Sequence, residues 1–214
     1  MRFTYDRLLL IATIYLSCSA ATCRKYDIVG YHFTENINLY PEQKIYHIGD
    51  TIWIEHQNPT HMVYDKSYNL YFLADTFSIP FYFLCETVYN LPPDTTNTFC
   101  NFIVNGVNVG PNYNKKVFGC NSQDSFNFKI GMVLNKTGTF SIGFPVGGME
   151  VVACNFISTT PGQQIRVFSM SYRFTYIDGH KDIFLGVTPA RRSFDKEWVD
   201  EALKNKIIYF FKVE

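Results

Sequence analysis

Glu55, His56 and His61 place one carboxylate and two imidazoles in a short segment of the chain. These groups are ligands that Zn²⁺ and Cu²⁺ accept, so the three residues are the best candidate for a metal site. Their spacing matches no closed structural zinc motif, and the intervening Asn58 and Pro59 favour a turn with two solvated imidazoles. We therefore assign no metal and no other cofactor, and keep Glu55, His56 and His61 as a candidate to be tested.

Two short motifs match fragments of the pattern of penicillin-binding proteins and β-lactamases. Residues 193–196 read S-x-x-K, and residues 136–138 read K-T-G. They occur in the reverse of that family's chain order, and no S-D-N accompanies them. The G-x-S-x-G, H-E-x-x-H, phosphate-loop and EF-hand motifs are absent from the sequence. We assign no catalytic residue, although triads and carboxylate pairs can assemble from distant positions.

The cysteines favour disulfide chemistry over metal binding. Five of the six follow residue 21: Cys23, Cys85, Cys100, Cys120 and Cys154. The sequence contains no C-x-x-C, and in an oxidising compartment such cysteines pair with one another. The disulfide candidates are Cys85, Cys100, Cys120 and Cys154, and we expect Cys100 to pair with Cys120 or Cys154. One thiol must remain unpaired, and Cys85 or Cys23 can fill that role.

Aromatic residues are abundant, with 15 Tyr and 20 Phe. Most Phe side chains are expected in the core. Four tyrosines in loop-like segments are candidates for a flat platform that binds a sugar or a peptide: Tyr64, Tyr68, Tyr89 and Tyr113. The alternative is that these rings only fill the structure.

The elements that must position these residues are mostly strands. Apolar and polar residues alternate over 126–130 and 168–176, the pattern of a strand with one buried and one wet face. Asn105-Gly106 and Asp178-Gly179 suit tight hairpin turns, and the second turn is expected to lead into a strand over 183–187. The spacing of runs and turns predicts a mainly β chain, an antiparallel β-sandwich of about ten strands.

One short C-terminal helix is expected after Ser193, which can cap it. Phe194, Trp198 and Ala202 recur every four residues and would form one apolar stripe facing the body of the protein. No repeat, linker or charge block divides the chain, so we expect one domain over residues 22–214.

The first 21 residues have the layout of a signal peptide. Arg2 and Arg7 precede an apolar run, and small residues follow at 19–21. Cleavage after Ala21 would leave a chain free of lipid. The alternative is a bacterial lipoprotein signal, in which Cys18 becomes the acylated first residue and anchors the chain to a membrane. No later stretch has the length of a spanning helix. We expect an exported protein of the periplasm, the outer membrane or the extracellular space.

Charge composition argues against nucleic-acid binding. Nineteen Lys and Arg balance nineteen Asp and Glu, so no uniform basic field exists to attract phosphates.

Residues 49–54, GDTIWI, resemble the turn leading into a strand in immunoglobulin-like and other Greek-key modules of bacterial envelope proteins. The likeness implies a structural or binding unit and transfers no functional residue. We therefore expect an exported, non-catalytic structural or binding module of the cell envelope, with a protein or glycan partner. The alternative is a glycan-binding protein or a hydrolase whose site is spread over loops. The oligomeric state stays open.

The expected signal peptide, residues 1–21, leads to the first prediction. We expect the intact mass of the exported product to correspond to a chain that begins at Thr22, because small residues occupy the two positions that a leader peptidase inspects. A product that begins at an acylated Cys18 would support the lipoprotein alternative. A product that retains residues 1–21 would contradict both.

Overall fold

The computed structural model describes residues 28–88, 99–111, 115–118, 126–154, 165–189, 192 and 194–214. Residues 30–156 and 167–214 belong to one compact unit, and the described residues 28–29 and 165–166 belong to another. The description below concerns the first unit. The expected leader, residues 1–21, lies outside the described residues.

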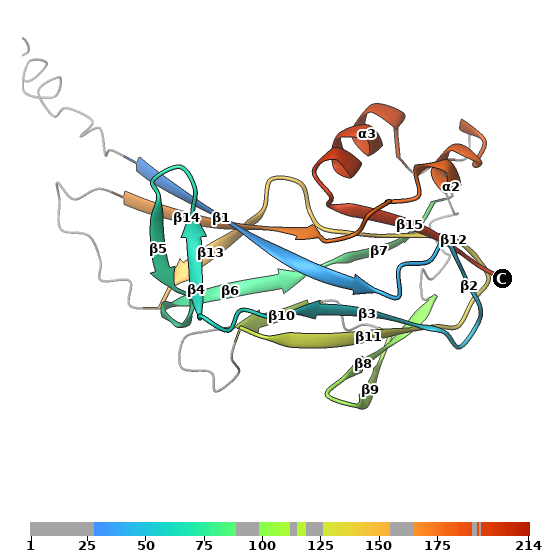
Figure 1. Ribbon diagram of the computed structural model, residues 1–214, viewed down its shortest axis with the longest axis horizontal. Helices are drawn as coiled ribbons and strands as arrows, with labels where there is room; N and C mark the ends of the chain where they lie inside the picture. Colours follow the sequence, from blue (N-terminus) through green and yellow to red (C-terminus); the bar gives the residue numbers. More distant parts are fainter. Residues whose placement is uncertain are drawn as a thin grey trace, which may run out of the picture. The chain divides into compact units, whose positions relative to one another are not determined.

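Strands dominate the described residues and form two sheets (Figure 1). The larger sheet has eleven strands, of which nine follow the order β10-β6-β13-β14-β1-β3-β11-β8-β9, while β4 pairs with β1 and β5. Its strands are β1 (Ile28–Tyr40), β3 (Thr51–His56), β4 (Met62–Asp65), β5 (Leu70–Leu73), β6 (Phe77–Tyr82), β8 (Cys100–Val104), β9 (Val107–Gly110), β10 (Lys115–Phe118), β11 (Phe128–Leu134), β13 (Met149–Ala153) and β14 (Ile165–Phe174). A 3-10 turn, η1 (Ala74–Thr76), precedes β6.

The smaller sheet has the order β2-β15-β12-β7. Its strands are β2 (Ile45–Tyr46), β7 (Leu84–Thr87), β12 (Gly138–Gly143) and β15 (Ile208–Val213). Strands β6 and β7 are consecutive, and only Phe83 separates them. The chain therefore passes from the larger sheet to the smaller one at this residue, which is itself fully buried.

Aromatic rings fill the core that the two sheets share. Phe81 of β6 is fully buried, and its ring centroid lies 4.1 Å from that of Phe128 and 5.1 Å from that of Tyr172. In the smaller sheet, Phe140 stacks on Phe99 with centroids 4.0 Å apart, and Phe99 directly precedes β8 of the larger sheet. These ring contacts join strands that are not hydrogen-bonded to one another, and they bury large apolar areas.

Two helices pack on β15 of the smaller sheet: α2 (Lys181–Leu185) and α3 (Lys196–Lys204). Phe184 of α2 stacks on Phe210, and α3 buries Val199 and Ala202. Both faces of β15 are therefore buried from Ile208 to Phe211. The cap of α3 corrects the sequence expectation. Asp195 is the N-cap and accepts a hydrogen bond from the Trp198 amide, while Ser193 lies outside the described residues.

The mainly β prediction is confirmed, but its details need three corrections. The described residues hold more strands than the ten expected, and two helices rather than one. The pairing is not antiparallel throughout, because β2 runs parallel to β15, with Lys212 opposite Ile45. The segment expected as a strand over 183–187 belongs largely to α2. Asn105-Gly106 does form the predicted turn between β8 and β9, with positive φ at both residues.

None of the helices among the described residues combines the length and the apolar character that a membrane crossing requires.

The core packing generates the second prediction. Phe81→Ala should lower the free energy of unfolding by about 3–5 kcal/mol, because it leaves a cavity between β6, β11 and β14. Ile177→Ala is the control, since Ile177 is 95% exposed, and it should change stability by less than about 0.5 kcal/mol. Urea unfolding followed by circular dichroism measures both. Equal losses in the two variants would contradict the assignment of Phe81 to the core.

Candidate functional site

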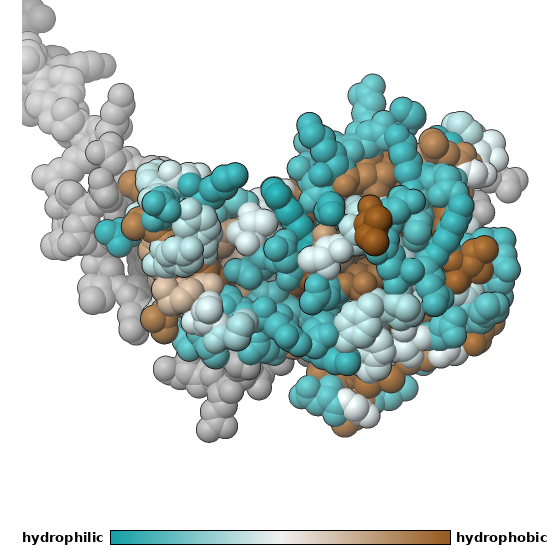
Figure 2. Space-filling model, viewed as in Figure 1, coloured by the Kyte–Doolittle hydropathy of each residue, from teal (hydrophilic) through white to brown (hydrophobic). Residues whose placement is uncertain are grey.

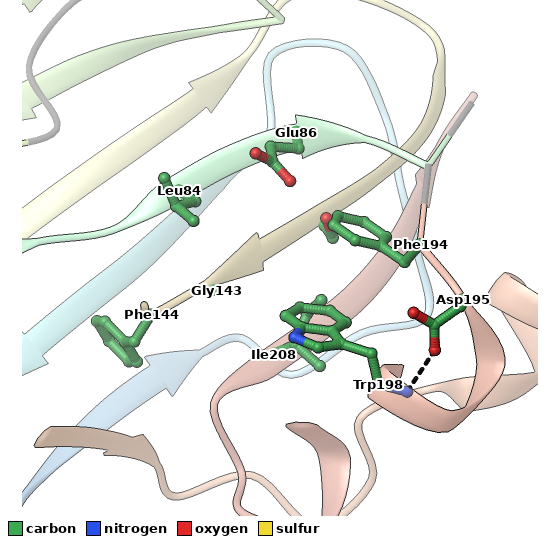
Figure 3. A pocket seen from close by; sticks show the side chains of 9 residues that line it. Leu84, Glu86, Gly143, Phe144, Phe194, Asp195, Trp198 and Ile208 are labelled. Carbon is green, nitrogen blue, oxygen red and sulfur yellow. Dashed lines mark hydrogen bonds between the residues drawn. The ribbon is translucent and has the colours of Figure 1, made fainter. Parts of the chain in front are cut away.

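A cavity of about 330 Å³ lies between α3 and the outer face of the smaller sheet. This volume is at the lower end of the roughly 300–1,000 Å³ typical of ligand pockets. Its lining comes from four segments of the chain: Leu84, Glu86, Ser141, Gly143, Phe144, Phe194, Asp195, Trp198 and Ile208 (Figure 3). We call this cavity the α3 pocket.

The residues that the smaller sheet contributes to the α3 pocket form its floor, and the pleat of the sheet places them on one face. Glu86 pairs with Ser141, and Leu84 pairs with Gly143, which in turn pairs with Ile208. Residues directly opposite each other on antiparallel strands point to the same side, so these five positions share the outer face. Gly143 contributes no side chain to this face. A Cβ at this position would lie only 3.2 Å from the Ile207 carbonyl oxygen.

The first turn of α3 forms the opposite wall. The rings of Phe194 and Trp198 stack with centroids 4.9 Å apart and an interplanar angle of 14°. Figure 3 shows both rings, Leu84 and the Glu86 carboxylate around the same space, whereas the Asp195 carboxylate is turned to the helix. There Asp195 Oδ1 accepts a hydrogen bond of 2.7 Å from the Trp198 amide. This cap fixes the start of α3 and thereby the position of both rings.

Glu86 is the acidic residue on the sheet side of the α3 pocket. Partial burial raises the pKa of its carboxyl group above the ordinary value, because the charged form loses contact with water. A ligand that offers hydrogen-bond donors to this carboxyl would replace part of the lost hydration. The α3 pocket thus combines an apolar aromatic wall with a hydrogen-bonding carboxyl on the opposite side.

A second hollow, of about 400 Å³, has a more polar lining that includes Glu55, His56 and Lys129. It contains two residues of the predicted metal site, but His56 is not available to a metal. The His56 side chain is 1% exposed, Nδ1 donates to the Phe126 carbonyl oxygen at 2.7 Å, and Nε2 lies 2.9 Å from Glu35 Oε2. Both ring nitrogens are therefore engaged inside the protein.

The other two residues of the predicted metal site point elsewhere. Glu55 precedes His56 on β3, so the two side chains leave opposite faces of the strand. Glu55 accepts hydrogen bonds from Tyr40 and Gln57, which lower the pKa of its carboxyl. His61 Nδ1 lies 3.5 Å from Asp75 Oδ1. The structure does not bring Glu55, His56 and His61 together, and no group of three potential ligands gathers anywhere in the described part of the chain.

Two of the four platform tyrosines can be located. Tyr64 is on β4 and packs its ring on Tyr71 of β5, with centroids 4.7 Å apart. Tyr68 is in the turn between these strands and packs on Tyr31. Both belong to one hairpin. Tyr89 and Tyr113 lie outside the described residues, so the platform as a whole stays a prediction.

The cysteines correct one expectation. Cys100 is a free, buried thiol, so its expected pairing with Cys120 or Cys154 is wrong for this structure. The physical reason is that Cys100 faces the interior from β8, where its neighbour is Cys85, also free. Cys154 is disulfide-bonded, with a partner outside the described residues. Cys18, Cys23 and Cys120 also lie outside them, so the lipidation of Cys18 stays a prediction.

The residues that define the α3 pocket are not among the site residues predicted from the sequence. Phe194 and Trp198 were assigned to a stripe packing on the body of the protein, and Glu86 was not singled out. The available signal was weak. An acidic residue next to the apolar run 81–85 could have drawn attention, but nothing in the sequence places it opposite a helix that starts more than a hundred residues later.

Neither a protein-family model nor a curated protein matches the chain. The α3 pocket must therefore be interpreted from its own chemistry.

The raised pKa of Glu86 generates the third prediction. A carboxyl group whose pKa is higher in the folded than in the unfolded protein contributes most to stability below about pH 4.3, and this contribution is lost as pH rises through the folded-state pKa. Glu86→Gln should therefore raise the free energy of unfolding near pH 7, and the gain should shrink towards pH 4. Urea unfolding at several pH values measures the difference from the unaltered chain.

Glu55→Gln is the matched control, because the pKa of Glu55 is shifted in the opposite direction. A lowered pKa contributes stability above the unfolded-state value, so this variant should lose stability near pH 7. A Glu86 variant that loses stability near pH 7, as the Glu55 variant does, would contradict the effect of burial on Glu86.

Proposed function

We propose that this chain is an exported, non-catalytic binding module of the cell envelope and that its ligand is a sugar unit of a glycan held in the α3 pocket. The observation that carries the proposal is the pairing of the Phe194–Trp198 wall with the Glu86 carboxyl across one cavity. In this proposal the two sheets form a β-sandwich of the immunoglobulin-like or Greek-key kind, and residues 1–21 are removed on export.

The chemistry of a sugar ring fits these two walls. A pyranose has an apolar side made of C–H groups, which can pack on an aromatic ring. It also has a rim of hydroxyl groups, which can form hydrogen bonds. Trp198 and Phe194 offer apolar area, while Glu86 accepts hydrogen bonds from hydroxyl groups. The Ser141 hydroxyl adds a further polar group on the floor. The ligand needs no net charge, which agrees with the balanced charge of the chain.

The exposed surface supports a local site rather than a broad apolar contact. On the face shown in Figure 2, hydrophobic residues lie in small patches separated by hydrophilic ones. Stable protein interfaces of standard size bury roughly 800 Å² on each partner, with a core depleted of charged residues. The separation of the hydrophobic patches among the coloured residues of this face favours a small ligand over a large protein partner there.

The second candidate function is that of a glycoside hydrolase. It is favoured by the presence of two carboxyl groups, Glu86 and Asp195, in the lining of one pocket, together with the raised pKa of Glu86. Such a pair is the arrangement that acid-assisted glycoside cleavage uses. Against it, Asp195 already accepts the capping hydrogen bond of α3 and is turned away from the cavity (Figure 3).

The fourth prediction tests binding. A glycan array identifies the best ligand of the purified chain, and titration calorimetry measures its affinity. Trp198→Ala should weaken binding by about 30-fold, since the loss of a central aromatic contact costs on the order of 2 kcal/mol and each 1.4 kcal/mol is tenfold. The matched control is Trp53→Ala, which removes the only other tryptophan, on β3 and outside the α3 pocket.

Equal affinity of the Trp198 and Trp53 variants, or silence of the unaltered chain on the array, would overturn the binding proposal. To distinguish the hydrolase from the non-catalytic module, the same ligand is incubated with the unaltered chain and with Glu86→Gln, and its cleavage is measured. Cleavage by the unaltered chain that is lost in Glu86→Gln would support the hydrolase. Intact ligand with both proteins supports the non-catalytic module.

A further inference from the structure

Two free thiols meet in the core, away from the α3 pocket. Cys85 is on β7 of the smaller sheet and Cys100 is on β8 of the larger sheet, and both are free cysteines. The side-chain thiol of Cys85 is hydrogen-bonded to that of Cys100. The two residues therefore face each other between strands of different sheets.

The side chains around the two thiols give separate evidence that Cys85 and Cys100 lie close together. Phe83, two residues before Cys85, has its ring centroid 5.6 Å from that of Phe102, two residues after Cys100. Side chains two residues apart in a strand point to the same face, so these two segments run in opposite directions with matched inward positions. Cys85 Sγ also lies 3.7 Å from the sulfur of Met132 on β11, the strand beside β8.

We propose that Cys85 and Cys100 form an intramolecular disulfide that links the two sheets when the chain folds in the presence of a disulfide oxidant. The oxidant is a small-molecule or protein disulfide. The Cys85 thiolate attacks one sulfur of the oxidant and releases one thiolate. The Cys100 thiolate then attacks the Cys85 sulfur and releases the second. Two cysteine thiols are oxidised to one disulfide, and one oxidant disulfide is reduced to two thiols.

The environment of the two thiols indicates that the disulfide forms during folding and not afterwards. Desolvation, together with the neighbouring Cys100, raises the pKa of the Cys85 thiol well above its ordinary value, and Cys100 is only 3% exposed. Thiolate is the attacking species, so exchange is slow in the folded protein and faster while the chain is still folding. The pairing would leave Cys154 bonded to its own partner and is consistent with one unpaired thiol among the five cysteines after residue 21.

The sequence makes the bond easy to locate. No Lys or Arg lies between residues 67 and 114, so trypsin leaves both cysteines, and no other, in one fragment. Glu86 is the only glutamate between Cys85 and Cys100, so a glutamate-specific protease separates the two cysteines. Fragments joined by a disulfide stay together after this second cleavage until a reductant is added.

The fifth prediction uses the full mature chain, refolded from denaturant with reduced and oxidised glutathione. Free thiols are blocked with iodoacetamide, and the chain is then cut with both proteases and analysed by mass spectrometry without reduction. We expect the two pieces on either side of Glu86 to remain joined, and to separate with dithiothreitol. We also expect the Tm to rise relative to the chain refolded under reducing conditions, and the Cys85–Cys100 bond should contribute roughly 6–12 °C of that rise.

Blocked thiols on both Cys85 and Cys100, or a bond from either residue to another cysteine, would overturn the proposal. Cys85→Ser and Cys100→Ser are the matched variants. Each should lose the part of the Tm rise that the Cys85–Cys100 bond causes and leave the remaining thiol fully blocked. The mapping of the unaltered chain decides the question even if a variant fails to fold. Neither readout involves the α3 pocket, so this test and the glycan-binding test can fail separately.

Discussion

The burial of aromatic rings between the two sheets holds the rest of the structure in place. Phe99, Phe140 and Phe211 form one group of contacting rings, and Phe81 is the centre of another. Each fully buried ring of this size contributes about 1.5–3 kcal/mol by leaving water. The Phe99 group joins the two sheets, because Phe99 directly precedes β8 of the larger sheet while Phe140 and Phe211 are on β12 and β15 of the smaller one. It thereby helps to fix where β12 lies, and with it part of the floor of the α3 pocket. The Phe81 group joins β6, β11 and β14 within the larger sheet.

The pocket exists because the helices cover only part of the outer face of the smaller sheet. Phe184 of α2 covers Phe210, and the buried residues of α3 are Val199 and Ala202. Near β7 the wall is formed instead by the rings that begin α3, and a cavity remains between them and Glu86. The Asp195 cap sets the first turn of the helix and so controls the width of this opening.

Neighbouring residues of β7 have opposite roles because a strand is pleated. Cys85 points into the core and contacts Cys100, while Glu86 points outward and lines the α3 pocket. The same geometry separates two residues of the candidate metal site, since Glu55 and His56 are also consecutive residues of one strand. Two adjacent side chains with suitable chemistry can cooperate in a loop or a helix turn, but they diverge in a strand.

Much of the local structure could be predicted from the sequence alone. Alternation over 168–176 predicted the strand that the structure has as β14, Asn105-Gly106 predicted the turn between β8 and β9, and the four-residue recurrence from Phe194 predicted α3. These signals are local, because side-chain period and the tolerance of positive φ depend on residues close in the chain. The segment 183–187 was misassigned because a short apolar run fits a buried strand and a short helix equally well.

The candidate site could not be predicted in the same way. Glu86, Ser141, Trp198 and Ile208 come from distant segments, and only the register of β7, β12 and β15 brings them to one face. The proximity of Cys85 to Cys100 likewise depends on how two sheets pack. The sequence by itself determined that the chain is mainly β, that the long alternating run is a strand, which turn is tight and where a helix has its apolar side, because period and backbone preference are local properties. The tertiary structure alone decided which side chains share a cavity or a contact, because close packing of the core selects one arrangement of the strands.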